Sequence, residues 1–435
     1  MFRKLVLFVS IVALCRAADT ARMDQIVESF VSAKTFMGTV LVARGDEVLF
    51  SKGYGMANLE WDNPNSPSTK FRLGSITKQF TAASILLLEE RGKLKIGDPV
   101  KKYIPDAPPA WDKVTIFHLL THTSGIPSFT GFPDYSQTEA IPTTPEKLVA
   151  RFRDKPLEFE PGQKWKYDNS GYVLLGYLIE KISGKTYEDF VKENIFVPLR
   201  MRDSGYDSNS AIIRHRAYGY SPGPNGPVNA GFIHMSIPFS AGSLYSTTED
   251  LLRWEHGLFG GKVLSAALIE KMTTPFKENY AFGLVVHTVN GHKVIEHGGG
   301  IEGFNTQLTY YPEDQVTVAV LGNLNGGAPG EIASKLGALL HGDAVVLPSE
   351  RKEITLPVAK LAGYVGTYEL KPGFDLVVTL EGGQLMTQAT GQAKLPMFAE
   401  SETRFFLKAV DAQIEFSGDH LVLHQGGQDV TGKKK

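Results

Sequence analysis

Hydrophobic positions cluster most densely between residues 76 and 88, and their spacing predicts a buried helix. Apolar side chains there cover most of the helical circumference, which is typical of a helix packed between other elements. A second apolar stretch, from Tyr172 to Ile182, predicts another helix. Gly92 and Gly184 follow the two stretches, and glycine is the residue that most often ends a helix.

Other segments alternate between apolar and polar positions and predict antiparallel hairpins. Asn290-Gly291, between two such segments, is a strong signal for a tight turn. The predicted strand pairs are residues 39–43 with 48–54, 280–289 with 292–297, and 305–311 with 316–321. Amphipathic segments at 24–32 and 330–340 predict helices at both ends of this region. We therefore expect an α/β (α+β) fold, with one antiparallel sheet flanked by helices and a mostly helical lobe from the middle of the chain.

The pattern changes near Pro348, where short strands follow one another with glycine-rich turns between them. This spacing predicts a small all-β, barrel-like domain over residues 359–435. A linker over residues 346–358 would join it to a first domain over residues 18–345. We expect the terminal lysines, residues 433–435, to form a solvated tail.

The first residues have the pattern of an export signal. Two basic residues precede an apolar run from Leu5 to Leu14, and Cys15-Arg16-Ala17 resembles a cleavage motif. We therefore expect residues 1–17 to be a signal peptide and the protein to be periplasmic or secreted. Lipid attachment at Cys15 is the second interpretation, because leucine is bulky for the position before a lipidated cysteine. The run is too short to span a membrane, and we expect no transmembrane segment.

The charge of the chain argues against a polyanionic partner. The formal net charge is −2 over 435 residues, with acidic and basic residues interleaved. No basic patch indicates binding to nucleic acid or to an anionic membrane. Small molecules are the expected partners, and the sequence leaves the oligomeric state open.

Ser75 and Lys78 form the first candidate for chemistry, at the start of the predicted buried helix. Helix positions three residues apart lie on one face, so the hydroxyl and the amine can come within hydrogen-bonding distance. Such a pair supplies a nucleophile and a base. The pattern is weak by itself, because it recurs at Ser349-Glu350-Arg351-Lys352, a charged segment that we interpret as a solvated linker. A helix cap beside a surface lysine is the ordinary explanation of such a pair.

Two further motifs make it less probable that the Ser75–Lys78 pair occurs by chance. Tyr167-Asp168-Asn169 lies in a loop before a helix, and His297-Gly298-Gly299 ends a predicted strand at a run of three glycines. Each alone has an ordinary explanation, a packed tyrosine beside a capping asparagine in one case and a flexible strand exit in the other. Their order and settings carry the argument: helix-borne Ser-x-x-Lys, loop-borne Tyr-x-Asn, then strand-borne His-x-Gly.

In this order the motifs resemble those of the serine β-lactamase and penicillin-binding-protein superfamily, closest to its class C branch. That branch includes class C β-lactamases, DD-peptidases, D-aminopeptidases and family VIII carboxylesterases. The resemblance covers about Met23 to Leu340, and the C-terminal domain resembles the lipocalin-like extension of some members. Further segments that carry it are His118 to Gly125, Pro161-Gly162, Ala241 to Leu244 and Thr248-Glu249-Asp250.

The resemblance implies a role for each motif residue. Ser75 would be the acylated nucleophile, with Lys78 and Tyr167 as its catalytic partners. Asn169 would contact the substrate or Lys78. In the substrate-binding and oxyanion region the implied residues are His297, Gly299 and Gly300, with the backbone N–H groups of Ser75 and Gly300 as the oxyanion donors. The superfamily needs no cofactor for this chemistry, and we expect none.

Ordinary pKa values leave the choice of base open. Lysine titrates near ~10.4 and tyrosine near ~10, so each needs a shifted pKa to act as a base at neutral pH. A cationic Lys78 could lower the pKa of Tyr167. His297 stands where β-lactamases have the lysine of Lys-Thr-Gly, and a histidine is only partly protonated at neutral pH. We expect weaker recognition of a substrate carboxylate, which favours simple esters over penicillins.

The leading hypothesis is an acyl-serine hydrolase, most specifically a carboxylesterase for short-chain esters with weak β-lactamase activity. The alternative is a DD-peptidase or D-aminopeptidase that acts on cell-wall peptides or β-lactams, and a remote one is a non-catalytic penicillin-binding module. We expect no metal site, because the spacing of five between His287, His292 and His297 alternates their faces on strands around a tight turn. The chain also has no His-Glu-x-x-His motif.

Overall fold

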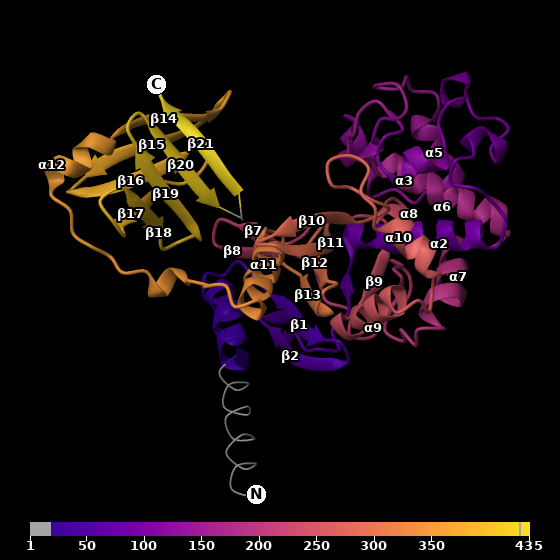
Figure 1. The fold of residues 1–435 in the computed structure, drawn as a ribbon, viewed down its shortest axis with the longest axis horizontal. Coiled ribbons are helices and arrows are strands. Elements are labelled where there is room, and N and C mark those ends of the chain that lie inside the picture. The colour runs from indigo at the N-terminus through magenta and orange to yellow at the C-terminus, as the bar shows by residue number, and fades with distance from the viewer. Residues whose placement is uncertain (1–18, 426–427) are drawn as a thin grey trace, which may run out of the picture. The chain divides into compact units, whose positions relative to one another are not determined.

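A computed structural model describes residues 19–425 and 428–435 of the protein (Figure 1). The predicted signal peptide, residues 1–17, lies outside the described residues. The chain divides into two compact units. One unit is Phe36–Pro329, and the other joins the segment that ends at Thr35 to Gly330–Lys435.

A six-stranded sheet is the centre of the first unit, with the strand order β10-β11-β12-β13-β1-β2. Its neighbouring strands pair antiparallel throughout, which confirms the three predicted hairpins. The strand before the Asn290-Gly291 turn is shorter than predicted, because Gly283, at a φ of +69°, turns the chain before it. The strands are β1 (Gly38–Arg44), β2 (Glu47–Tyr54), β10 (Val285–Val289), β11 (His292–Ile301), β12 (Phe304–Tyr311) and β13 (Val316–Gly322).

The predicted central helix is α2 (Thr77–Glu90), which follows a 3₁₀ turn, η1 (Gly74–Ile76). Every side chain of α2 from Thr77 to Leu88 is buried, as the continuous apolar pattern indicates. The helix packs against α6 (Asn169–Ser183) and α8 (Phe239–Gly242). Its Phe80 ring stacks on Trp254 of α9 (Thr248–Phe259), with centroids 4.2 Å apart, and α9 covers β1 and β13. α2 is therefore held between the other helices and the sheet.

The remaining elements of the first unit are mostly short and helical, which agrees with the predicted helical lobe. Three short strands form a small sheet in the order β5-β9-β6, and β3-β4 and β7-β8 are two-stranded ribbons. These elements are β3 (Met56–Asn58), β4 (Asn63–Pro64), β5 (Phe71–Arg72), η2 (Val100–Lys102), η3 (Pro109–Trp111), α3 (Ile116–Leu120), η4 (Phe129–Gly131), α4 (Tyr135–Thr138), α5 (Pro145–Arg153), α7 (Tyr187–Val191), η5 (Lys192–Phe196), β6 (Gly205–Tyr206), β7 (Tyr220–Gly223), β8 (Gly226–Asn229), β9 (Leu244–Ser246) and α10 (Ala266–Met272).

The second unit contains a closed eight-stranded barrel, β14 to β21. Its interior is filled by apolar side chains that include Tyr368, Phe405 and Phe416. Before the barrel lie a helix over residues 19–32, α11 (Ala328–Leu340), η6 (Pro348–Glu350), α12 (Val358–Leu361) and η7 (Ala362–Tyr364). The strands are β14 (Gly366–Lys371), β15 (Phe374–Glu381), β16 (Gln384–Ala389), β17 (Leu395–Ala399), β18 (Arg404–Leu407), β19 (Ala412–Ser417), β20 (His420–Gln425) and β21 (Gln428–Lys434).

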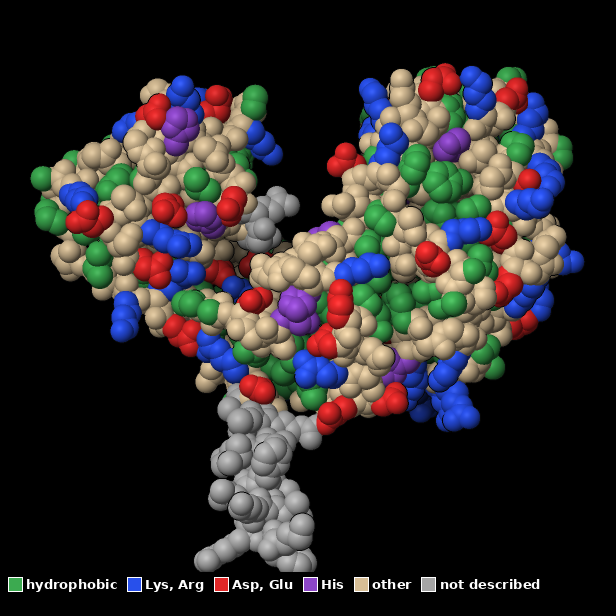
Figure 2. Space-filling view, in the orientation of Figure 1, with side chains coloured by type: hydrophobic (Ala, Val, Ile, Leu, Met, Phe, Trp, Pro, Cys, Tyr) green, Lys and Arg blue, Asp and Glu red, His purple; other side chains and the backbone are tan. Residues whose placement is uncertain are grey.

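The prediction of a solvated lysine tail is wrong. Lys433 and Lys434 belong to β21 and pair with β14, which closes the barrel. Lys435 lies 2.8 Å from Asp375 in an ion pair. The backbone makes the hydrogen bonds of a strand whatever its side chains are. A run of lysines can therefore form a strand although its composition is typical of an exposed tail. Elsewhere acidic and basic side chains are interspersed over the face shown in Figure 2, as the small net charge suggests.

No helix of the described residues, 19–425 and 428–435, is long and apolar enough to cross a membrane. The second Ser-x-x-Lys, at Ser349 and Lys352, is exposed and lies at η6 with no apolar helix behind it.

Deleting residues 428–435 tests the closure of the barrel. We expect the free energy of barrel unfolding to fall by more than about 4 kcal/mol, because β14 and β20 each lose a hydrogen-bonded neighbour. Hydrogen exchange of the β14 and β20 amides measures this effect. The control, Lys435→Ala, removes only surface ion pairs and should change stability by less than about 1 kcal/mol. Unchanged protection of both strands in the deletion variant would contradict closure by β21.

Candidate active site

Ser75 lies in the 3₁₀ turn that leads into α2, half-buried beside strand β11. The preceding Gly74 has a φ of +54°, a conformation that favours glycine. A Cβ atom on Gly74 would lie 2.8 Å from the backbone nitrogen of Gly300. The glycine therefore allows the Ser75 turn and the β11 backbone to approach each other closely.

Lys78 is fully buried, and its amine nitrogen lies 3.0 Å from Ser75 Oγ. The amine donates to Asn169 Oδ1 and to the carbonyl oxygen of Ala241, each at 2.9 Å. Burial lowers the pKa of Lys78 to about 7, and the charge of Asp168 opposes this shift. A neutral amine has two N–H groups, which these two acceptors use, so its lone pair is left for the Ser75 hydroxyl proton.

Tyr167 donates its hydroxyl proton to Ser75 Oγ across 2.6 Å, and its ring lies 4.8 Å from the Lys78 nitrogen. The expectation that Lys78 lowers the pKa of Tyr167 is wrong. Burial raises the pKa of this phenol well above its ordinary value. Tyr167 therefore stays protonated at neutral pH, and Lys78 is the group whose pKa is moved towards neutrality.

Asn169 is the first residue of α6, and its amide oxygen accepts a hydrogen bond from Lys78. Of the two roles predicted for Asn169, contact with the substrate or with Lys78, the structure contains the contact with Lys78. Its Nδ2 group donates to Thr130 Oγ1 at 3.1 Å. Because this second bond fixes the orientation of the amide, Asn169 Oδ1 is held towards the lysine. Asp168 caps the same helix by accepting the Gly171 N–H at 3.0 Å.

His297 is buried in β11. The expectation that it is partly protonated at neutral pH is wrong. Its Nδ1 lies 2.6 Å from the carbonyl oxygen of Gly298, and its Nε2 lies 3.1 Å from the Tyr280 hydroxyl. A carbonyl oxygen only accepts, so Nδ1 carries the proton and Nε2 accepts from Tyr280. Burial, with a smaller effect from the charge of Lys78, lowers the pKa of His297 to about 4. The residue is neutral at pH 7 and has no unused N–H group.

The run Gly298 to Gly300 belongs to β11, which extends through it to Ile301 and pairs with β12. A Cβ atom on Gly299 would lie 1.9 Å from the Leu73 carbonyl oxygen, which also accepts from Thr306 Oγ1 at 2.8 Å. Side chains are therefore excluded where the strand passes the Ser75 turn. This close approach brings the predicted oxyanion residues Ser75 and Gly300 together.

Sequence reasoning missed three buried residues, His122, Tyr280 and Asp168. The His122 ring lies 4.5 Å from both the Tyr167 and the Tyr280 rings, and its Nδ1 accepts the Asp168 N–H at 3.1 Å. Burial lowers the pKa of His122 far below its ordinary value. We refer to a set of linked rings beside Lys78 as the aromatic enclosure. Tyr167 and Tyr172 lie nearest the Lys78 amine, and His122, Trp165, Tyr280 and His297 contact those rings or one another. For Asp168 the sequence did contain a signal, because an ionisable side chain stands between two motif residues, Tyr167 and Asn169.

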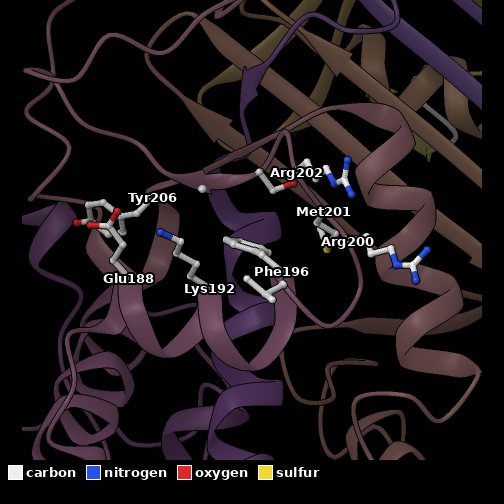
Figure 3. A pocket seen from close by; sticks show the side chains of 10 residues that line it. Glu188, Lys192, Phe196, Arg200, Met201, Arg202 and Tyr206 are labelled. Carbon is white, nitrogen blue, oxygen red and sulfur yellow. The ribbon is translucent and has the colours of Figure 1, made fainter.

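A cavity of about 360 Å³ lies elsewhere in the first unit, between α7, η5 and β6. Figure 3 shows Lys192 towards one end and Arg200 and Arg202 towards the other, with Phe196 between them. These cations do not converge on one point, and none of the candidate catalytic residues lines the cavity. It is therefore separate from the Ser75 site.

Among residues 19–425 and 428–435, no group of three or more His, Cys, Asp and Glu side chains is arranged to hold a metal ion. His287 instead lies 3.0 Å from Glu296, whose hydrogen bond and charge raise the histidine pKa.

Comparison with known proteins identifies the family. The model of the Beta-lactamase family matches residues 23–342. The chain belongs to the Beta-lactamase family. A second family, described as a domain of unknown function (DUF3471), matches residues 350–421, which include most of the barrel.

Relatives within this family include penicillin-binding proteins. Penicillin-binding protein 4* of Bacillus subtilis is 32% identical over 94% of this chain and 97% of its own length. A solved structure of an octameric penicillin-binding protein homologue from Pyrococcus abyssi is 29% identical, with a TM-score of 0.70, and the match covers 95% of this chain and all of that one. A D-stereospecific amidohydrolase from Streptomyces is 27% identical, with a TM-score of 0.65, over 75% of this chain and 99% of that one. The protein is thus a serine hydrolase of the β-lactamase and penicillin-binding-protein type.

Gly299→Ala tests the close approach of β11 to the Ser75 turn. Its Cβ would overlap backbone atoms of Leu73, so we expect a loss of hydrolase activity of about 100-fold or more, as for a misplaced reactive group. Gly298→Ala is the matched control, because the one close contact of its Cβ would be the end of the flexible Gln307 side chain, at 2.9 Å, while the Thr306 carbonyl oxygen would lie at an ordinary 3.5 Å. Turnover rates and melting temperatures of both variants give the comparison. Equal activity of the two variants would contradict the proposed constraint.

Proposed function

We propose that this serine hydrolase is a carboxylesterase that hydrolyses short-chain esters through an acyl-enzyme on Ser75. The observation that carries the proposal is the neutral state of His297 and the use of both its ring nitrogens within the protein. The position implied to recognise a substrate carboxylate thus offers neither a positive charge nor a free donor. A neutral ester needs neither.

Acylation in this proposal begins at the Ser75 hydroxyl. As Oγ bonds to the ester carbonyl carbon, its proton moves to the lone pair of Lys78, and the carbonyl oxygen becomes an oxyanion. The N–H groups of Ser75 and Gly300 stabilise that charge, and such a donor is typically worth about 3 to 4 kcal/mol of barrier. The carbon–oxygen bond to the alcohol then breaks. The departing alkoxide takes the proton of Tyr167, which regains one from the Lys78 ammonium.

Deacylation repeats the steps with water. A water molecule attacks the acyl carbon and passes a proton to Lys78, and the collapse of the intermediate breaks the bond to Ser75 Oγ. That oxygen regains a proton from the Tyr167 hydroxyl, 2.6 Å away, and Lys78 reprotonates Tyr167. The products are the carboxylic acid and the free enzyme, so atoms and protons balance without a cofactor.

The pKa directions favour Lys78 over Tyr167 as the base. A general base works best when its pKa lies near the operating pH. The Lys78 pKa, lowered to about 7, meets this condition, and the raised Tyr167 pKa does not. In this proposal Tyr167 therefore passes protons from the Lys78 ammonium to the departing oxygen, acting as a donor and not as the base.

A second candidate function is the hydrolysis of D-amino acid amides or of D-alanyl peptides, with or without activity on β-lactams. The specific observation is Glu302, two residues after Gly300 at the β11–β12 turn. Its Oε2 is buried and has no hydrogen-bond partner within the described part of the chain. A carboxylate there would attract the ammonium group of an amino acid amide. The likeness to the Streptomyces amidohydrolase adds support for this alternative.

The pH dependence of ester hydrolysis tests the base. We expect kcat/KM to fall as the pH is lowered through about 7, because Lys78 gains a proton there and loses its lone pair. His297, with a pKa of about 4, is already neutral throughout this range and adds no limb. Initial rates with a p-nitrophenyl ester across the neutral range give the profile. A rise that begins only in strongly alkaline solution would contradict Lys78 as the base.

The chain supplies its own control for this experiment. Ser75→Ala and Lys78→Ala should each lower kcat by about 10⁴-fold or more. The same changes in the exposed second motif, Ser349→Ala and Lys352→Ala, should leave the rate as it is.

A substrate panel separates the two candidate functions. We expect kcat/KM for a neutral p-nitrophenyl ester to exceed that for a chromogenic cephalosporin, since a charge-assisted contact to the cephalosporin carboxylate, worth about 10 to 100-fold, is missing. Faster β-lactam turnover would overturn the esterase assignment. If D-phenylalanine amide is instead the best substrate, Glu302→Gln should weaken its turnover and the exposed-residue control Glu278→Gln should not.

A further inference from the structure

Asp168 is a buried carboxylic acid that the reaction proposed above leaves without a role. It is 4% exposed and lies between Tyr167 and Asn169 in the sequence. Those two neighbours contact Ser75 and Lys78, respectively. Any movement of Asp168 would therefore move both groups that face the reacting pair.

The contacts of Asp168 fix its backbone and one carboxyl oxygen. Oδ2 accepts the Gly171 N–H at 3.0 Å and the Ser124 hydroxyl proton at 3.4 Å. The Asp168 N–H donates to His122 Nδ1 at 3.1 Å. Oδ1 is buried and has no hydrogen-bond partner within the described residues. Helix capping uses only one oxygen, so it does not account for a carboxylate here.

Asp168 differs from the rings near Lys78 because it can carry a charge that acts on the lysine. From α6 the lysine faces Tyr172, and from the loop before it Tyr167, both with pKa values raised by burial. The remaining members of the aromatic enclosure are also uncharged at neutral pH. They are His122 after α3, Trp165 in the loop before Tyr167, Tyr280 before β10 and His297 in β11. Asp168 is thus the one group described around Lys78 that can carry a negative charge there.

Resting on the proposed function, we propose that Asp168 is a positioning residue that holds Tyr167 and Asn169 in place and stabilises the ammonium formed on Lys78 when Ser75 is acylated. Lys78 accepts the Ser75 proton in that step and becomes a cation in a site with little water. An opposite charge nearby favours the cation more strongly in such surroundings than in solvent.

The arrangement parallels the division of labour in a serine–histidine–aspartate triad. There a buried aspartate orients the base and stabilises its protonated form without taking the proton. Here Asn169 makes the hydrogen bond to the base, and Asp168 supplies the charge from the adjacent position. The two tasks that one aspartate performs in the triad are divided between neighbouring residues.

The electrostatics of both groups agree with this geometry. The charge of Asp168 raises the pKa of Lys78 against the lowering by burial, and the charge of Lys78 lowers the pKa of Asp168, which burial raises to about 7. Formation of the ammonium on Lys78 therefore favours the ionised carboxylate of Asp168.

A purely structural role predicts a different result, which makes the proposal testable. Asparagine and serine cap helices about as well as aspartate, so Asp168→Asn and Asp168→Ser keep the cap and remove the charge. The readout is the second-order rate constant for labelling of Ser75 by a fluorophosphonate, measured against pH on the full chain. This labelling needs the nucleophile and its base but no particular substrate.

We expect Asp168→Asn to slow labelling at least about tenfold and to move the midpoint of the acid limb about one pH unit or more downwards. The direction follows because a neutral amide no longer favours the protonated Lys78. Asp168→Ser should move the midpoint in the same direction and carries the test if the first variant does not fold, as judged by thermal unfolding. Loss of a cap alone would lower the rate or the stability without moving the midpoint.

Glu255→Gln is the matched control. Glu255 is a buried carboxyl in α9 whose pKa burial raises to about 8, and it is absent from the groups acting on Lys78. Its replacement should leave the midpoint where it is. A folded Asp168 variant with an unshifted midpoint would overturn this proposal while leaving Ser75 as the nucleophile. Failure of the unaltered protein to label at Ser75 would instead overturn the proposed function.

Discussion

Burial of the Lys78 amine is the constraint on which the rest of the site depends. Burial lowers the lysine pKa from 10.5 to about 7. This shift means that folding disfavours the protonated amine by a free energy on the order of 5 kcal/mol. The unfolded chain binds this proton more readily, so the associated loss of stability is present at pH 7 and disappears as the pH rises towards 10.5. The apolar face of α2 and its packing on α6, α8 and α9 offset this loss.

The same constraint dictates what surrounds the amine. A neutral lysine in a dry site needs acceptors for two protons, and Asn169 and the Ala241 carbonyl oxygen provide them. The third direction is left for Ser75, whose position depends on the close approach of β11 at Gly74 and Gly299. Backbone that approaches so closely cannot carry side chains. The glycines and the buried lysine therefore meet one requirement of the proposed mechanism, which is to bring a neutral base and the proposed oxyanion donors to the same hydroxyl.

The sequence predicted those elements whose signals are local. The Asn290-Gly291 turn, the apolar run of α2 and the order of Ser75, Tyr167 and His297 along the chain all led to features that the structure contains. The state of a buried group was not predictable in this way. His297 was expected to be partly charged, but its pKa is lowered by burial and by the charge of Lys78, and neither effect is visible from its own motif. For the same reason Lys433 and Lys434 were predicted to be a tail, since the strand is revealed by its pairing with β14 and β20.

Substrate choice and base strength are linked through the neutral aromatic enclosure. A lysine at position 297 would place a second cation close to Lys78, and two neighbouring cations would each disfavour the protonated form of the other. With a neutral histidine bonded to Tyr280, the one positive charge that forms during the proposed acylation is the ammonium of Lys78. A single carboxylate, Asp168, is then enough to balance it. In the proposed esterase, the neutral histidine that weakens recognition of an anionic substrate therefore also leaves the base without a neighbouring cation. The two properties are expected to change together when position 297 is altered.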